Sequence, residues 1–360
     1  MNKRRVFILG AGFSKQVGMP LATELTDLLL ERFQQNNIHE MLEWYESLKR
    51  RIHWMGDNSI NIEQVFDLAH YDIMAWRMKQ QQGHISRKIS SASIKVEERR
   101  DWLNWMERDL SHIIWDKQNK AMPHLKKIMN FSQNLQIDDV ILTFNYDTLL
   151  EKSLTKKSKK WHYGFNLENG HGVKILKMHG SINWKIANRG ETNSNNGLLF
   201  RKENLNVTEC NTPEPVEPGD KYELALITDD EFDNFIIQNS KIWKEINCVG
   251  IAGLGAHKQL HSLPGSWEVW SNAMNALEET DEIYIVGFSL SLFDSMVRLN
   301  FAGAMLNRNE NGNLPKKIIL IDPYACDLKQ KYQSVFGSIT PITVYQSKAE
   351  QIDWNHLLNI

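Results

Sequence analysis

Five groups of polar or glycine residues follow short apolar runs in this 360-residue chain. Residues of these types can bind phosphates, order a water molecule and accept a proton. The groups are Gly10, Ala11, Gly12 and Ser14; Asn145 with Asp147; His179; Gly287 with Ser289; and Asp322. In an open parallel sheet, ligands bind at the carboxyl ends of the strands. We therefore predict that the five groups meet at one edge of one sheet and form a single site.

The first group has the composition of a phosphate-binding loop. Its glycines let backbone N–H groups approach a phosphate, and Ser14 can donate a hydrogen bond to a phosphate oxygen. A tight turn followed by a capped helix is the alternative. The dehydrogenase fingerprint G-x-G-x-x-G is not met, because Lys15 stands where the third glycine belongs. No acidic residue ends a second strand about 20 positions later, so an ordinary NAD dehydrogenase is disfavoured.

The later groups carry side chains suited to proton transfer and to holding water. A histidine such as His179 serves as a base near neutral pH, and an amide such as Asn145 orients water without titrating. Each group also has a purely structural alternative. Asn145 and Asp147 can form an Asx turn that caps the next helix, and His179 can be a satisfied histidine beside a glycine turn. Ser289 can cap a helix, and Asp322 can start a turn before a proline.

Apolar runs and helical patterns alternate along most of the chain. The predicted strands are 6–9, 140–144, 173–178, 224–227, 248–252, 283–286, 318–321 and 342–345. The predicted helices include 21–33, one from about 148, 267–279 and 295–306. Strands that are apolar on both faces are typical of a parallel sheet covered by helices on both sides. The predicted fold class is therefore α/β, with a Rossmann-like parallel sheet.

Two segments depart from this alternation within what we predict to be a single domain over residues 1–360. Residues 36–135 have a helical pattern and six tryptophans, which indicates a helical insertion whose tryptophans anchor its core. Residues 187–222 are rich in Asn and Pro, which indicates an irregular loop.

Composition excludes several functional classes. The 42 basic and 44 acidic residues give a net charge of −2, so no nucleic-acid partner is predicted. Cys210, Cys248 and Cys326 lie far apart, which excludes a disulfide framework and a local cysteine zinc site. No apolar window is long enough to span a membrane, and the N-terminal apolar run is too short for a signal peptide. We expect a soluble, cytoplasmic protein without a metal site or membrane contact.

Four motifs together resemble the sirtuin, or SIR2-like, superfamily. They are GAGFSKQVGMP at residues 10–20, FNYD at 144–147, MHGS at 178–181 and IVGFSLSLFD at 285–294. Their order and spacing match the family from residue 5 to about residue 325. The resemblance implies the SIR2-like, or DHS-type, NAD-binding fold.

The resemblance also implies a role for each predicted site residue. Asn145 would contact the nicotinamide ribose or position the attacking water, Asp147 would support the nicotinamide pocket, and His179 would be the general base near the ribose hydroxyls. The remaining residues would bind the NAD phosphates or lie near the adenosine ribose. They are Gly10, Ala11, Gly12, Ser14 and Pro20 for the first motif, and Gly287, Ser289 and Asp322 for the later elements.

Two departures from the sirtuin deacylases change the expected activity. The chain lacks their four-cysteine zinc module, because residues 187–222 offer only Cys210, and residues 36–135 have no counterpart in those compact enzymes. In both respects the chain resembles bacterial SIR2-like antiphage-defence proteins, which consume NAD. This implies an NAD+ hydrolase that uses NAD as substrate and forms ADP-ribose and nicotinamide. A deacylase or ADP-ribosyltransferase and a non-catalytic NAD or ADP-ribose sensor are the alternatives. Regulation by homo-oligomer formation or by a partner sensor or activator protein is also expected.

Overall fold

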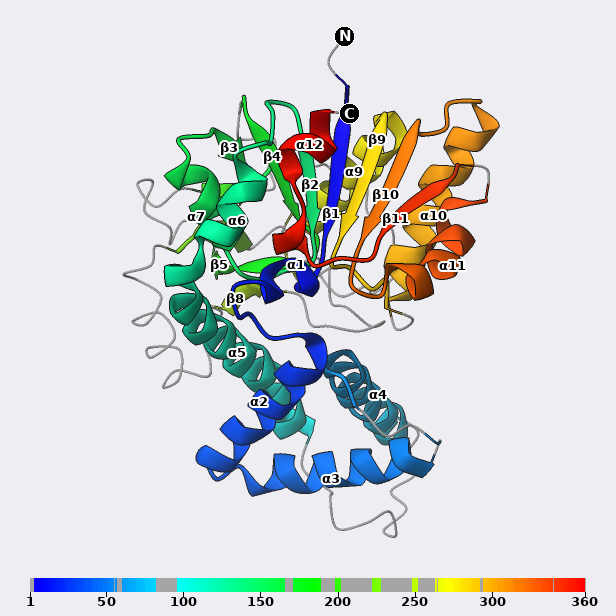
Figure 1. The fold of residues 1–360 in the computed structure, drawn as a ribbon. Helices are drawn as coiled ribbons and strands as arrows, with labels where there is room; N and C mark the ends of the chain where they lie inside the picture. The colour runs from blue at the N-terminus through cyan, green and yellow to red at the C-terminus, as the bar shows by residue number, and fades with distance from the viewer. Residues whose placement is uncertain are drawn as a thin grey trace.

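A seven-stranded, fully parallel sheet forms the centre of the structure, a computed structural model (Figure 1). Its strand order is β11-β10-β9-β1-β2-β4-β3. The strands are β1 (Arg5–Leu9), β2 (Val140–Thr143), β3 (Trp161–His162), β4 (Val173–Lys177), β9 (Glu282–Val286), β10 (Lys317–Ile321) and β11 (Ile342–Tyr345). The structure describes residues 3–54, 56, 60–81, 96–165, 171–188, 198–201, 222–227, 248–251, 263, 265–291, 294–338 and 340–359.

The central strand, β1, pairs with β2 on one side and β9 on the other. Every residue of β1 and of β9 is buried, as expected for strands covered on both faces. After β1 the chain forms β2, then the edge strand β3, and then β4, which lies between them, and it later continues with β9 on the opposite side of β1. The strand order therefore reverses between β1 and β9, and such a switch point opens a crevice at the carboxyl ends of the strands.

Helices cover both faces of the sheet, which confirms the predicted Rossmann-like α/β class. On one face α6 (Lys126–Ser132) packs against α7 (Leu149–Lys156), and Phe131 of α6 meets Trp354 of α12 (Trp354–Asn359) edge-on at 4.8 Å. On the other face α10 (Ser295–Glu310) packs between α9 (Ser266–Glu279) and α11 (Ala325–Phe336). The predicted helix and strand positions agree closely with these bounds.

A lobe of four helices lies beyond the carboxyl edge of the sheet (Figure 1). It comprises α2 (Ala22–Gln35), α3 (His39–Trp54), α4 (Ile62–Gln81) and α5 (Val96–Ala121), with α2 in contact with the other three. The segment 36–135, predicted to be a helical insertion, contains α3, α4, α5 and α6. Helix α2 belongs to the lobe, while the 3₁₀ turn η1 (Met122–His124) and α6 lead into the sheet.

The tryptophans of the insertion do not all have the predicted core position. Trp44 and Trp115 are buried, as predicted. Trp54, at the end of α3, is 91 % exposed, so it anchors no core. The side chains of Trp76, Trp102 and Trp105 lie outside the described residues.

A second, antiparallel sheet follows His179, and its separate existence was not predicted. Its order is β6-β7-β5-β8, formed by β5 (Gly180–Asn188), β6 (Leu198–Arg201), β7 (Tyr222–Leu226) and β8 (Cys248–Ile251). The predicted strands 224–227 and 248–252 therefore belong to this sheet and not to the parallel one. The reason is that an apolar run specifies a buried strand but not its partner. The segment 187–222, predicted to be an irregular loop, contains strand β6, and most of its remaining residues, Cys210 included, lie outside the described residues.

Candidate functional site

A cavity of about 780 Å³ lies at the carboxyl edge of the parallel sheet and is closed on one side by the helical lobe. Nearly all the residues predicted as site residues line it. They are Ala11, Gly12, Ser14, Pro20, Asn145, Asp147, His179, Gly287, Ser289 and Asp322. Gly10 is the predicted residue outside the cavity wall, and its carbonyl oxygen accepts a hydrogen bond from Asn145. The structure thus brings the five groups together, as the strand-end argument predicts.

The glycine loop after β1 packs directly against the loop after β9. The Gly10 N–H donates to the Val286 carbonyl at 3.1 Å, and the Gly12 N–H donates to the Gly287 carbonyl at 2.9 Å. A Cβ added at Gly12 would lie 2.7 Å from the Gly287 Cα, and Gly287 itself has a positive φ of +58°. These glycines therefore permit a close backbone approach between two loops, and the two N–H groups expected to face a phosphate bind protein carbonyls instead.

Asn145 is fixed in one orientation by the glycine loop. Its Nδ2 donates to the Gly10 carbonyl at 2.9 Å and to the Ser14 Oγ at 3.0 Å. Because a carbonyl oxygen only accepts, the nitrogen of the Asn145 amide must face Gly10. The two amide hydrogens are thereby used, and Oδ1 is the atom with which Asn145 can accept a hydrogen bond from a ligand or a water molecule.

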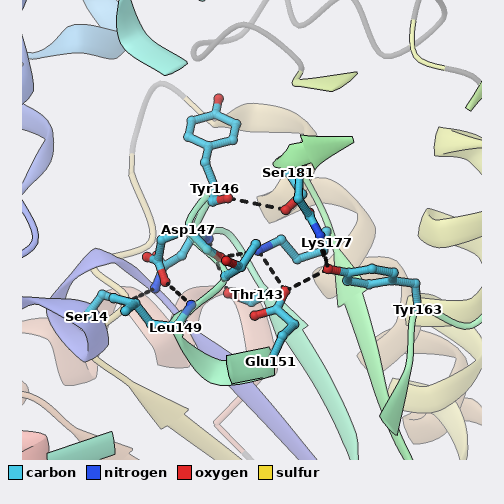
Figure 2. A network of polar contacts seen from close by, with 12 residues as sticks. Ser14, Thr143, Tyr146, Asp147, Leu149, Glu151, Tyr163, Lys177 and Ser181 are labelled. Carbon is cyan, nitrogen blue, oxygen red and sulfur yellow. Dashed lines mark hydrogen bonds and ion pairs between the residues drawn. The ribbon is translucent and has the colours of Figure 1, made fainter. Parts of the chain in front are cut away.

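Asp147 forms the Asx turn that was the structural alternative for this group, directly before the N-cap residue Thr148 of α7. Its Oδ1 accepts from the Leu149 N–H at 3.1 Å at the start of α7. Its carbonyl oxygen accepts from the Nζ of Lys177, which also pairs with Glu151 at 3.2 Å (Figure 2). The hydroxyl of Tyr163 donates to the same Glu151 carboxylate. This buried network, which was not predicted, supports the loop that carries Asn145.

His179 is buried beside a carboxylate that was not among the predicted site residues. Its Nε2 lies 3.5 Å from the Oδ2 of Asp294, and its ring meets the Phe144 ring edge-on at 5.0 Å. The other oxygen of Asp294 accepts from the Val297 N–H at 3.2 Å, so Asp294 is the N-cap of α10. The available sequence signal was an aspartate directly before a predicted helix, at the last position of the fourth motif.

The helical lobe contributes to the cavity wall, which was also not predicted. Asn61 and Glu63 at the start of α4 and Ile114 of α5 line the cavity. The Ser291 hydroxyl, from the loop after β9, donates to the Glu63 carboxylate. This bond connects the lobe to the sheet across the cavity.

The Tyr146 ring points away from the buried network (Figure 2). Burial raises the pKa of Tyr146 well above its usual value, and the charges of Glu107, Glu63 and Asp294 act in the same direction. The phenol therefore stays protonated and can donate a hydrogen bond. At the opposite end of the cavity, burial raises the pKa of Asp322, partly offset by the Tyr324 N–H that donates to it at 2.8 Å.

Glu107 of α5 gives the folded protein a pH-dependent stability. Burial raises its pKa to about 8, so the folded state binds a proton that the unfolded state releases near pH 4.5. Stability contributed by this group is complete below the unfolded pKa and is lost as pH rises toward 8. Between pH 6.5 and 8 the expected loss is about 1.6 kcal/mol, because the slope of about 1.4 kcal/mol per pH unit decreases as the pH approaches this pKa.

The expected result for Glu107→Gln is a free energy of unfolding that no longer declines over this pH range, measured by urea titration at pH 6.5 and pH 8. Glu310→Gln, on the exposed end of α10, is the matched control and should keep the wild-type decline. An unchanged pH dependence in Glu107→Gln would contradict the assignment.

The fold and the site together define a doubly wound α/β protein with a cavity at its topological switch point. Residues 139–333 match the family model described as the SIR2-like domain, which is more than half of the chain. The chain therefore belongs to the SIR2-like family, and the resemblance seen in the sequence is confirmed.

Solved Sir2 structures are similar to this chain at low identity. One is Sir2 in complex with the inhibitor EX-527, 2′-O-acetyl-ADP-ribose and a deacetylated peptide, at 10 % identity and a TM-score of 0.36, covering 99 % of this chain and 93 % of that one. Another is a Sir2 homologue mutant in complex with ADP-ribose, at 13 % identity and a TM-score of 0.36, covering 99 % and 91 %. A third is Sir2Tm bound to a propionylated peptide, at 9 % identity and a TM-score of 0.38, covering 99 % and 92 %. No curated protein sequence matches the chain significantly.

The residues that the structure describes contain neither a membrane-spanning helix nor a metal-binding cluster. No helix there has the length and apolar character needed to cross a bilayer. No group of three or more His, Cys, Asp or Glu side chains there could hold a metal ion.

Proposed function

We propose that this protein is an NAD+ hydrolase that cleaves the nicotinamide–ribose bond and releases ADP-ribose and nicotinamide. The observation that carries the proposal is the meeting of Asn145 and His179 in one cavity. Binding a nucleotide requires neither a buried histidine nor an amide with its oxygen left to act as an acceptor. Membership of the SIR2-like family supports NAD as the substrate, and ten residues proposed to contact it line the same cavity.

The proposed reaction assigns one task to each of the two side chains. The nicotinamide–ribose bond breaks through an oxocarbenium-like centre, and nicotinamide leaves with the bonding electron pair. The Oδ1 atom of Asn145 accepts a hydrogen bond from water and orients it. As the water oxygen bonds to the ribose carbon, His179 takes the water proton. The carboxylates of Glu63 and Asp294 in the cavity wall favour the positive charge that develops on the sugar.

The wider role that we propose is depletion of cellular NAD in antiphage defence, in the cytoplasm. An enzyme that consumes NAD in this way harms its own cell unless it is inactive before a trigger. We therefore propose control through a homo-oligomer or through a partner sensor or activator protein. Binding of a second copy of this protein, or of a partner protein, would raise the population of the active conformation.

The test is to incubate the purified protein with NAD and to follow nicotinamide and ADP-ribose by chromatography. The wild type should form both products in equal amounts. Asn145→Ala should lower turnover by about 10²-fold, because the attacking water loses its orientation. Asn307→Ala is the matched control, since Asn307 is exposed and its amide bonds Glu278 on the surface.

Other outcomes separate the alternatives. Nicotinamide release that depends on an acylated peptide or an acceptor protein would favour a deacylase or an ADP-ribosyltransferase. Binding of NAD by calorimetry without any release would favour a sensor. The absence of NAD binding by the full chain would contradict the proposed site altogether.

A further inference from the structure

The Asp294 carboxylate is the buried acidic group closest to His179 in the cavity wall. Both side chains are almost completely buried, at 3 % and 4 % exposure, and the Oδ2–Nε2 distance is 3.5 Å. We propose that Asp294 is a positioning residue that holds His179 with its proton on Nε2 and its lone pair on Nδ1. The part of the inference that concerns turnover rests on the proposed function, whereas the part that concerns the protonated nitrogen does not.

The chemistry of the two groups decides which of them can donate to the other. An ionised carboxylate only accepts, so the imidazole nitrogen that faces Asp294 must carry a hydrogen. A neutral imidazole has one donor and one acceptor nitrogen, and Nδ1 is then the acceptor. Little water reaches this pair, and a low local dielectric strengthens the interaction.

The Asp294 carboxylate is itself held in one orientation, so it can favour one tautomer of the His179 imidazole. Its Oδ1 accepts from the Val297 N–H at 3.2 Å as the N-cap of α10. A carboxylate bonded through one oxygen to a helix end presents the other oxygen in a constant direction. The Phe144 edge and the Tyr146 ring, centred 5.0 Å and 6.1 Å from the imidazole, restrict His179 from its other sides.

The titratable groups near this pair do not oppose the assignment. Tyr146 is neutral, because burial raises its pKa well above the usual value. Glu107, which acts on Tyr146, is mostly protonated at neutral pH because burial raises its pKa to about 8. Glu63, whose carboxylate accepts a hydrogen bond from the Ser291 hydroxyl, attracts positive charge that forms on the ring during the reaction. In the proposed reaction, the Asp294 carboxylate stabilises the imidazolium that forms when His179 takes up a proton.

The first test measures the protonated nitrogen of His179 without NAD. The full-length protein is labelled with ¹⁵N-histidine, and the His179 ring signals are identified by their loss in His179→Gln. We expect the wild type to show the Nε2-protonated form. In Asp294→Asn the single amide oxygen should stay with the Val297 N–H, since asparagine is also a good N-cap. The NH₂ group then faces Nε2, and the proton should move to Nδ1.

A matched control makes the same change at another helix cap. Asp353→Asn alters the N-cap of α12, where Asp353 accepts from the His356 N–H at 3.1 Å on the surface. This control should leave the His179 signals unchanged. An Nδ1-protonated wild type, or an unchanged form in Asp294→Asn, would overturn the proposal. The wild-type spectrum alone decides the matter should Asp294→Asn not fold.

The second test measures turnover of NAD by the same variants. Asp294→Asn should lower turnover by at least about 10²-fold, because the wrong nitrogen carries the proton. The dissociation constant for NAD should change by less than about twofold, because the interaction acts in the chemical step and not in binding. If Asp294→Asn moves the His179 proton to Nδ1 but leaves turnover unchanged, the positioning role is overturned. If the wild type does not hydrolyse NAD at all, the proposed function fails while the nitrogen assignment still stands or falls on the spectra.

Discussion

Replacing His179 by alanine is expected to lower NAD hydrolysis by about 10²- to 10⁴-fold, the range typical of losing a general base. The effect should appear in turnover, because the imidazole takes a proton only as the water attacks. The affinity for NAD should change little, since the residues proposed to hold the phosphates and the adenosine ribose remain. The measurement is the rate of nicotinamide release at saturating NAD, together with NAD binding by calorimetry.

Two further variants separate chemistry from folding in this experiment. His179→Gln keeps a polar side chain of similar size and should be as inactive as His179→Ala, because an amide does not take up a proton near neutral pH. His356→Ala, on the exposed side of α12, is the matched control and should keep wild-type turnover. Wild-type hydrolysis in either His179 variant would show that the base is another group.

Much of the parallel sheet was predictable, because the signals that define it are local. A strand buried on both faces has a continuous apolar run, as in Val140–Thr143, and its end is marked where polar residues begin. The rule that parallel strands present their carboxyl ends at one edge then places Asn145 and His179 together without any knowledge of their contacts. The convergence of ten predicted residues on one cavity follows from this rule.

The missed features all depend on contacts between distant parts of the chain. Ser291 and Glu63 are 228 residues apart, and nothing in either local sequence indicates the other. The same holds for β7 and β8, whose apolar pattern specifies burial but not which sheet they join. Asp294 was missed for a different reason. A helix-capping aspartate is common, and only the fold shows that its second oxygen faces His179.

The glycine loop shows how one local pattern can serve two physical needs. Glycines after a first strand were expected to let N–H groups reach a phosphate. In the structure the N–H groups of Gly10 and Gly12 donate to the carbonyl oxygens of Val286, at the end of β9, and Gly287, in the loop after it. Because glycine has no side chain, the two loops can approach closely enough for these bonds. The phosphate contacts proposed for this loop are therefore left to the Ser14 hydroxyl and to backbone groups other than these two.

Replacing Arg5 by alanine should lower the free energy of unfolding by about 3–5 kcal/mol, the usual cost of leaving one member of a buried ion pair alone. Arg5 donates to both oxygens of Asp139, at 2.8 Å and 2.6 Å, and each side chain is 3 % exposed. The pair joins the first residue of β1 to the turn before β2. Burial raises the pKa of Asp139 and the Arg5 charge lowers it, so removing Arg5 raises this pKa further.

The pH dependence and a neighbouring residue make the Arg5 prediction specific. Without Arg5, the pKa of Asp139 in the folded state lies above its value in the unfolded state, so stability is lost as the pH rises. The urea midpoint of Arg5→Ala should therefore lie further below that of the wild type at pH 7 than at pH 5. Arg4→Ala is the matched control, because Arg4 pairs with Glu279 at 2.8 Å while both side chains are about two-thirds exposed. Such a surface pair contributes less than about 1 kcal/mol.

The destabilisation in Arg5→Ala comes from leaving the Asp139 carboxylate buried without a partner. The double variant Arg5→Met with Asp139→Leu removes both charges, so it should regain most of the free energy of unfolding that Arg5→Ala loses. Equal effects of Arg4→Ala and Arg5→Ala would show that the buried pair does not stabilise the junction of β1 and β2.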